Sequence, residues 1–106
     1  KNEMDKALEE VDCLLPPTQP TPAFKIGEQS NNPLKMYLED IFVTGASLAG
    51  LPAMSIPCGF AKPRKSDKHL PVGMQLIGPR FDEKILFNIG RAYQETTDWH
   101  KRKPVL

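Results

Sequence analysis

The sequence predicts an α/β fold in one small domain. Apolar residues recur with helical periodicity at 33–49 and again at 82–97, whereas 53–57 and 72–77 are short apolar runs typical of strands. The 11 prolines are about twice the usual share and supply fixed turns between short elements. A chain of 106 residues has room for one modest core.

The first third of the chain predicts one helix end and little other regular structure. Residues 1–10 are expected to be the end of a helix whose apolar residues share one side: Met4, Ala7 and Leu8. The apolar run 11–15, closed by two prolines, is expected to be a short buried strand. Residues 17–32 hold too many prolines for regular structure, so we expect an extended loop that packs along the surface.

One long helix is predicted from Pro33 to about Ala49. Asn32 is a favoured N-cap, proline is favoured at the first helical position, and Gly50 is a favoured end. Apolar residues cover nearly all sides of this helix, which is typical of a buried helix. Its broad apolar face consists of Leu34, Tyr37, Leu38, Ile41, Phe42 and Leu48.

Two polar stripes interrupt the apolar surface of the predicted helix. Lys35 and Glu39 form a narrow charged stripe, and Asp40, Thr44 and Ser47 form a second stripe of small polar groups. Burying an aspartate among apolar residues is costly unless something binds it. Asp40 is therefore either a cap bonded to nearby backbone or part of a pocket wall that receives a cationic or donor group of a ligand.

The second half of the chain predicts a hairpin followed by a helix. The strands at 53–57 and 72–77 are expected to pair across a charged loop at 60–71. Asp82 is the expected cap of a helix that runs to about Thr97. The core stripe of this helix is expected to be Ile85, Leu86, Ile89, Ala92 and Tyr93. The residues expected to face water are Lys84, Asn88, Arg91 and Glu95.

No combination of residues predicts a catalytic, cofactor or metal site in this chain. A serine nucleophile needs a base and backbone donors, usually on a glycine-rich turn, and none of the serines lies in such a turn: Ser30, Ser47, Ser55 and Ser66. Cys58 and His69 are candidates for a catalytic pair, but a free cysteine is more often a small buried hydrophobe. Cys13 and Cys58 match no metal or redox spacing, and His69 and His100 have no ligand partner at the usual spacing.

Charge and hydropathy limit the kinds of molecule that the chain is expected to bind. The net charge of +1 argues against nucleic acid as the main partner. The basic runs at 62–69 and 100–103 are interpreted as solvated surface, with contact to an RNA backbone as the alternative. No apolar run approaches the ~20 residues of a membrane span, and the cysteine usage favours a reduced intracellular protein. Since the chain begins at Lys1, we expect it to be a piece of a longer protein.

About two-thirds of the chain resembles the C-terminal end of amidase-signature enzymes. The resemblance rests on DCLLPPTQPTPAF (12–24), NNPLKMYLEDIFVTGASLAGLPAMSIPCG (31–59), LPVGMQLIGPRFDE (70–83) and WHKRKP (99–104). LAGLPAMSIPCG and PVGMQLIG are common to the whole family, whereas PTPAF and MYLEDIF are closer to its branch of glutamyl-tRNA(Gln) amidotransferase A subunits. The resemblance implies that 1–106 is a single C-terminal segment of an α/β/α amidase domain, with a mixed sheet and flanking helices.

The resemblance also implies where chemistry takes place. The Ser-Ser-Lys triad of the family lies upstream of the region present here, so no catalytic residue maps onto this chain, and the chain alone is expected to be inactive. Asp40 matches the aspartate of the family motif MYxxD, which implies that it holds the α-amino group of the donor glutamine. Relatives usually have Pro-x-Asn where this chain has 45–47 (GAS), so the contacts of that asparagine are in doubt.

By resemblance, the whole enzyme is a cytoplasmic complex that hydrolyses glutamine to ammonia on its A subunit. The B subunit would use ATP and Mg²⁺ to activate Glu-tRNA(Gln) and convert it to Gln-tRNA(Gln), and the C subunit would hold the other two together. Two other interpretations stay open. One is that the chain comes from another amidase-signature hydrolase that acts on a small amide, and the other is that it is a binding domain without catalysis.

Overall fold

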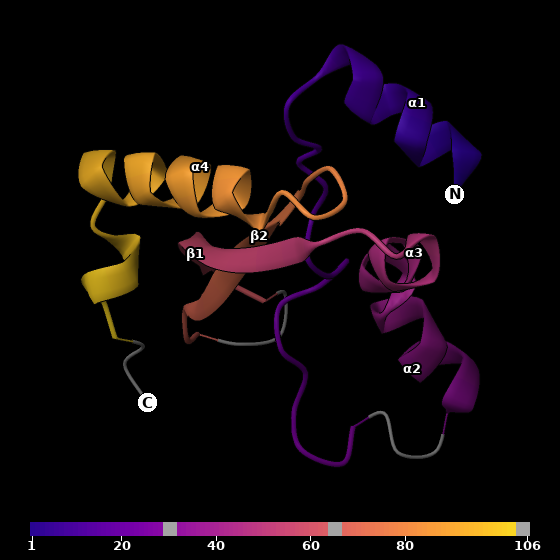
Figure 1. The fold of residues 1–106 in the computed structure, drawn as a ribbon. Coiled ribbons are helices and arrows are strands. Elements are labelled where there is room, and N and C mark those ends of the chain that lie inside the picture. The colour runs from indigo at the N-terminus through magenta and orange to yellow at the C-terminus, as the bar shows by residue number, and fades with distance from the viewer. Residues whose placement is uncertain (29–31, 64–66, 104–106) are drawn as a thin grey trace.

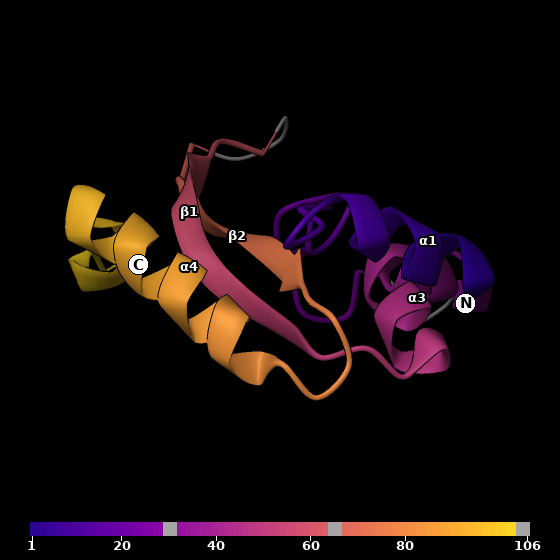
Figure 2. The ribbon, with the colours of Figure 1, turned by 45° about the horizontal axis from the view of Figure 1, so that its top comes forward.

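The computed structural model describes residues 1–28, 32–63 and 67–103. The elements in chain order are the helices α1 (Asn2–Glu10), α2 (Pro33–Glu39) and α3 (Ile41–Ala49), the strands β1 (Ala53–Ala61) and β2 (Leu70–Ile77), the helix α4 (Glu83–Thr96) and a short 3₁₀ helix, η1 (Trp99–Lys101). The α/β class is confirmed. In Figures 1 and 2, α4 lies on one side of the β1–β2 hairpin, and α1 and α3 lie on the other.

The hairpin is confirmed, but both of its strands are longer than predicted. β1 and β2 pair antiparallel from Ala53 opposite Ile77 to Ala61 opposite Leu70, so both ends of the predicted 60–71 loop, residues 60–61 and 70–71, are strand. A bulge between Pro57 and Gly59 leaves Cys58 outside the pairing. The extra residue lets the ladder resume beyond a proline, which cannot donate a hydrogen bond.

The predicted strand at 11–15 is present only as isolated bridges along β2. Leu14 and Ile77 exchange two backbone hydrogen bonds of 2.9 Å, and Pro17 bridges Met74. Adjacent prolines remove the donors that a continuous strand would need. The prediction that this segment is buried is also wrong in part, because Val11 and Leu15 are exposed.

The helix α4 covers the hairpin much as the sequence predicts. Leu86 is buried with Ile56 of β1 and Leu76 of β2, and the neighbouring residues packed around them include Ile85, Ile89 and Tyr93. Ala92, which was predicted in the core stripe, is exposed. A Cβ atom added to the buried Gly90 would lie 2.7 Å from Met54 Cε, so the absence of a side chain at Gly90 lets α4 approach β1 closely.

A second core cluster joins α1 and α3 to the end of the hairpin. It consists of Ala46, Ala49, Leu51 and Ile77, with Met4, Leu8 and Leu14 packed against it. The predicted apolar side of α1 is therefore confirmed for Met4 and Leu8. The α3 helix contributes alanines to this cluster, which allow it to pack closely, whereas its larger residues Ile41 and Leu48 are exposed.

The predicted single helix at 33–49 is wrong, because the chain forms two helices that meet at Asp40. Asp40 has φ −94° and ψ 5°, and its N–H donates to the Tyr37 carbonyl at 3.2 Å. Its own carbonyl accepts from Val43 and Thr44 of α3. The predicted ends are confirmed, since Asn32 Oδ1 accepts from the Lys35 N–H and Gly50 ends α3 in a left-handed conformation.

Candidate functional site

Asp40, the predicted ligand-binding residue, lies at the turn between α2 and α3 with an exposed side chain. The prediction that it is at least partly buried is wrong. The buried carboxylate is that of the preceding residue, Glu39, which is 7% exposed and accepts a hydrogen bond of 2.9 Å from Thr21 Oγ1. The break in the helix changes which side chains face inward, so the charged stripe predicted for Lys35 and Glu39 does not form.

The two hydroxyls predicted beside Asp40 bond to their own helix. Thr44 Oγ1 donates to the Asp40 carbonyl at 2.8 Å, and Ser47 Oγ donates to the Val43 carbonyl at 3.3 Å. Each is the local side chain-to-backbone bond typical of such residues in helices. Both side chains are exposed, so they stand near Asp40 without forming a binding cluster with its carboxylate.

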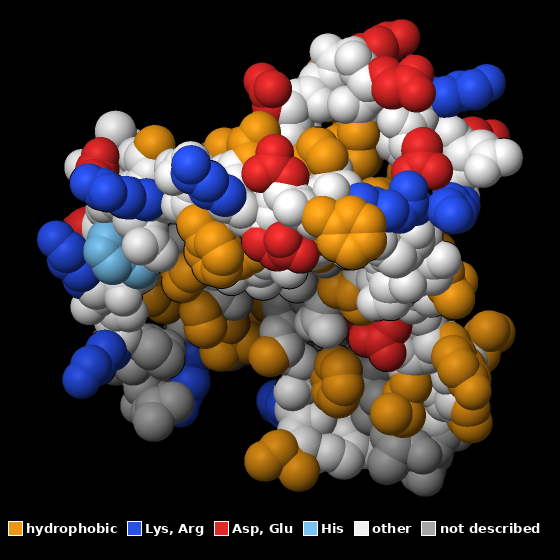
Figure 3. Space-filling view, viewed as in Figure 1, with side chains coloured by type: hydrophobic (Ala, Val, Ile, Leu, Met, Phe, Trp, Pro, Cys, Tyr) orange, Lys and Arg blue, Asp and Glu red, His pale blue; other side chains and the backbone are white. Residues whose placement is uncertain are grey.

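The surroundings of Asp40 are apolar. Tyr37, Leu38 and Ile41 have exposed fractions of 78%, 50% and 55%, and Leu48 at the far end of α3 is 81% exposed. Figure 3 shows apolar side chains gathered over the region of α2 and α3. The ion pairs recorded among the described residues do not include Asp40. A carboxylate set in such a surface is suited to a cationic ligand group once another part of a protein covers the apolar residues.

The structure gives no support to a Cys58–His69 catalytic pair. Cys58 lies in the bulge of β1, with its Sγ 3.5 Å from the Val72 carbonyl oxygen, and burial raises the pKa of its thiol. A reactive cysteine needs a lowered pKa. Burial likewise raises the pKa of the Cys13 thiol, an effect that a backbone hydrogen bond partly offsets.

The other candidates for chemistry are also unsupported in the described ranges. Ser47 bonds to backbone, and Ser55 Oγ lies 3.1 Å from Thr18 Oγ1, so neither has a histidine or lysine base. Ser30 and Ser66 lie outside the described residues. Among residues 1–28, 32–63 and 67–103, no group of three acidic, histidine or cysteine residues could hold a metal ion.

Arg80 is a polar residue of structural importance that the sequence did not indicate. Its Nη1 pairs with Asp5 Oδ1 at 2.8 Å, and its Nη2 donates to the Ala49 carbonyl at 2.6 Å. Arg80 therefore ties α1 to the last turn of α3, where carbonyls lack helical partners. The only signal in the sequence was an arginine placed directly after a strand and two turn residues.

Gln75 is a second polar residue of structural importance that the sequence did not indicate. It is buried in β2, with 3% of its surface exposed. Its Nε2 donates to the Phe42 carbonyl at 3.2 Å, and its backbone N–H donates to the Pro16 carbonyl. Gln75 thus fixes α3 against the hairpin.

None of the helices within the described parts of the chain is both long enough and apolar enough to cross a bilayer.

Comparison with known proteins identifies relatives across the whole chain. Over 106 residues it is 53% identical to the A subunit of the glutamyl-tRNA(Gln) amidotransferase of Thermodesulfovibrio yellowstonii and 57% identical to that of Hahella chejuensis. Identity to the same protein of Geobacillus kaustophilus is 46% over 106 residues. In each case the aligned region is 21% of the relative, so the chain spans about a fifth of the length of these proteins. The family model described as Amidase matches residues 1–87, and the chain therefore belongs to the amidase family.

Proposed function

We propose that the chain is part of the A subunit of a glutamyl-tRNA(Gln) amidotransferase and that this A subunit releases ammonia from glutamine. The observation that carries the proposal is identity of 53% and 57% to such proteins over all 106 residues. We call the longer protein that contains the chain the parent protein. Its catalytic Ser-Ser-Lys triad would lie outside these residues.

The part played by this chain would be recognition of glutamine at Asp40. An exposed carboxylate at the junction of α2 and α3 can accept charge-assisted hydrogen bonds from the α-ammonium group of an amino acid. The apolar residues around it would exclude water when the rest of the parent protein packs over them, and the lower local dielectric would strengthen the attraction. Asp40 would then set substrate preference without taking part in bond cleavage.

The proposal includes the other components of the complex. The B subunit would receive the ammonia and use ATP and Mg²⁺ to amidate Glu-tRNA(Gln), the C subunit would hold the complex together, and the site of action would be the cytoplasm. No residue of the present chain is assigned to ATP, Mg²⁺ or tRNA in this scheme.

The test is a comparison of two nitrogen donors, glutamine and a simple amide, with the same acceptor. The parent protein, assembled with the B and C subunits and supplied with ATP, Mg²⁺ and Glu-tRNA(Gln), should form Gln-tRNA(Gln) with glutamine as the donor. A simple aliphatic amide such as propionamide should support little formation of Gln-tRNA(Gln). Rapid hydrolysis of propionamide, with no Gln-tRNA(Gln) formed from glutamine, would instead assign the parent protein to amidases of small amides.

A further inference from the structure

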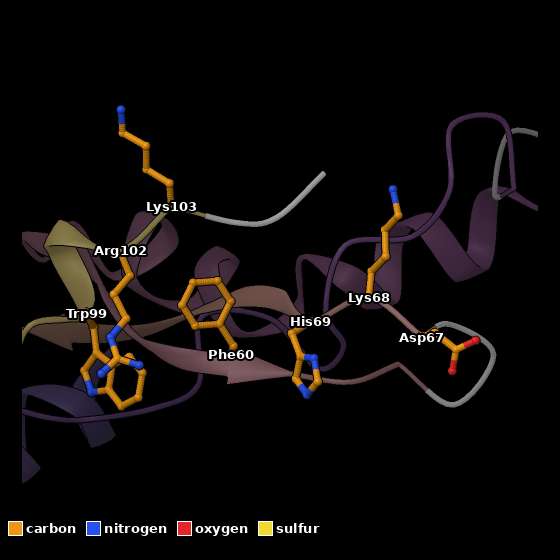
Figure 4. Close-up of a pocket in the computed structure, with 7 residues that line it drawn as sticks. All are labelled: Phe60, Asp67, Lys68, His69, Trp99, Arg102 and Lys103. Atoms are coloured by element: carbon orange, nitrogen blue, oxygen red, sulfur yellow. The ribbon is translucent and has the colours of Figure 1, made fainter.

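Parts of the two basic runs of the sequence, residues 67–69 and 102–103, lie at one hollow in the structure. Residues 67–69 precede β2 and residues 99–103 include η1, yet both segments line a pocket of about 750 Å³ beside the outer end of β1. The pocket is lined by Phe60, Asp67, Lys68, His69, Trp99, Arg102 and Lys103 (Figure 4). Phe60 lies near the end of β1, whereas α3 precedes the start of that strand, so the hollow and the Asp40 turn lie at opposite ends of β1.

The charge of the hollow is positive. Lys68, Arg102 and Lys103 each carry a full positive charge. The one carboxylate of the lining, that of Asp67, is paired at 3.0 Å with Lys62, which lies outside the hollow. Arg102 pairs with Asp98 through Nε at 3.0 Å, a contact that does not use the donors on its two Nη atoms. An anionic ligand is therefore favoured.

Two aromatic rings and a guanidinium plane line the hollow beside these cations. The Phe60 and Trp99 rings lie 6.3 Å apart at 59°, and Arg102 Cζ lies 4.4 Å from the centre of the Trp99 ring. In Figure 4, Phe60 lies between the Trp99–Arg102 pair and His69. Aromatic and guanidinium planes next to basic side chains are the features that bind unpaired bases together with their phosphates.

We propose that this hollow binds a single-stranded segment of RNA, with a base against Phe60 and Trp99 and phosphates near Arg102, Lys103 and Lys68. An acidic protein segment could use the cations but would leave the aromatic planes without a matching partner, so RNA fits the lining better. The proposal goes beyond glutamine hydrolysis and is tested without glutamine, so either proposal can fail alone.

The first measurement uses the parent protein and a labelled single-stranded RNA octamer. Fluorescence anisotropy should show saturable binding of the octamer. Each phosphate contact contributes about −0.7 to the slope of log K against log salt concentration, so three contacts predict a slope of about −2. An octamer without bases should bind roughly tenfold or more weakly, because stacking is lost.

Matched variants locate the site. Arg102→Gln should weaken octamer binding about threefold to tenfold and reduce the magnitude of the salt slope by about 0.7. Arg91→Gln is the control, because Arg91 also pairs with a carboxylate four residues away, Glu95, at 2.8 Å, but lies on α4 away from the lining. It removes the same charge and should leave the affinity unchanged. Lys103→Gln, beyond η1, should act like Arg102→Gln and supplies the test if the Arg102 variant misfolds.

Three results would overturn the proposal. No saturable binding of the octamer at low salt would exclude the site. Equal weakening by Arg91→Gln and Arg102→Gln would show a general charge effect. Displacement of the octamer by polyglutamate of equal charge, as effectively as by unlabelled RNA, would assign the hollow to an acidic protein segment.

Discussion

At the scale of single residues, Asp40 is the side chain to which the proposed function assigns recognition of glutamine. Asp40→Asn keeps the shape of the side chain but removes the charge that would hold the glutamine α-ammonium group. In the parent protein, kcat/KM for glutamine should fall roughly tenfold to a few hundredfold, as expected for the loss of a charge-assisted hydrogen bond. Amidation with free ammonia should be unchanged, because ammonia needs no amino-acid pocket.

Asp82→Asn is the matched control for Asp40→Asn. Asp82 is an exposed aspartate that precedes α4 and makes no side-chain capping bond. Removing its charge should therefore leave kcat/KM unchanged with either nitrogen donor, glutamine or ammonia. If Asp40→Asn lowers activity equally with glutamine and with ammonia, and also lowers the melting temperature, Asp40 has a structural role and does not bind glutamine.

Arg80 permits a prediction about stability. Arg80→Gln removes the ion pair with Asp5 and the bond to the Ala49 carbonyl. Both charged side chains are 31% exposed, so solvent screens the pair in part, and we expect unfolding free energy to fall by about 1–2 kcal/mol. Arg91→Gln, which breaks a more exposed pair, should cost less than about 0.5 kcal/mol. Denaturant melts of both variants check this, and equal costs would show that Arg80 does not tie α1 to α3.

Residue roles that depend on local backbone chemistry could be predicted from the sequence, whereas those that depend on packing could not. The cap by Asn32 and the left-handed Gly50 follow from their immediate neighbours. The burial of Glu39 in place of Asp40 does not, because it requires a helix break and a contact with Thr21, 18 residues earlier in the chain. A periodicity calculated over one straight helix places both carboxylates incorrectly.

At the scale of elements, too, features set by the local sequence could be predicted, whereas features set by packing could not. The helix at 83–96 was predicted well because its apolar stripe faces one neighbour, the hairpin. The strand lengths were underestimated because Pro57 reads as a strand end, and a bulge after it cannot be inferred from the pattern. The helices α2 and α3 were merged because no proline or glycine marks their boundary at Asp40.

The apolar surface of α2 and α3 predicts the behaviour of these elements in solution. Leu34, Tyr37 and Leu48 are each more than two-thirds exposed, with exposed fractions of 69%, 78% and 81%. Contiguous exposed apolar surface favours self-association or loose packing. The 106-residue chain should therefore bind a hydrophobic dye such as ANS and should associate with rising concentration in sedimentation experiments.

The double variant Leu34→Lys, Leu48→Lys places charges on that surface and should reduce both effects. Because both side chains are mostly exposed, helix content by circular dichroism should stay the same. A sharply melting monomer that binds no dye would show that this surface needs no partner.

At the scale of the whole molecule, the described residues form two small core clusters rather than one large core. Within the described residues the sheet has two strands, extended by bridges to residues 14 and 17. Such a small sheet depends on the helices packed on it for stability. The relatives are about five times as long, since 106 residues are 21% of each. Both facts agree with a role as one part of a larger amidase domain.

The central claim is that the parent protein hydrolyses glutamine with catalytic residues that lie outside this chain. Ammonia release from glutamine, measured on the 106-residue chain and on the parent protein within its complex, tests it most directly. We expect release by the assembled parent protein and none by the chain above a heat-inactivated control, because the described residues hold no nucleophile–base pair. Ammonia release by the chain alone, or none by the parent protein, would contradict the claim.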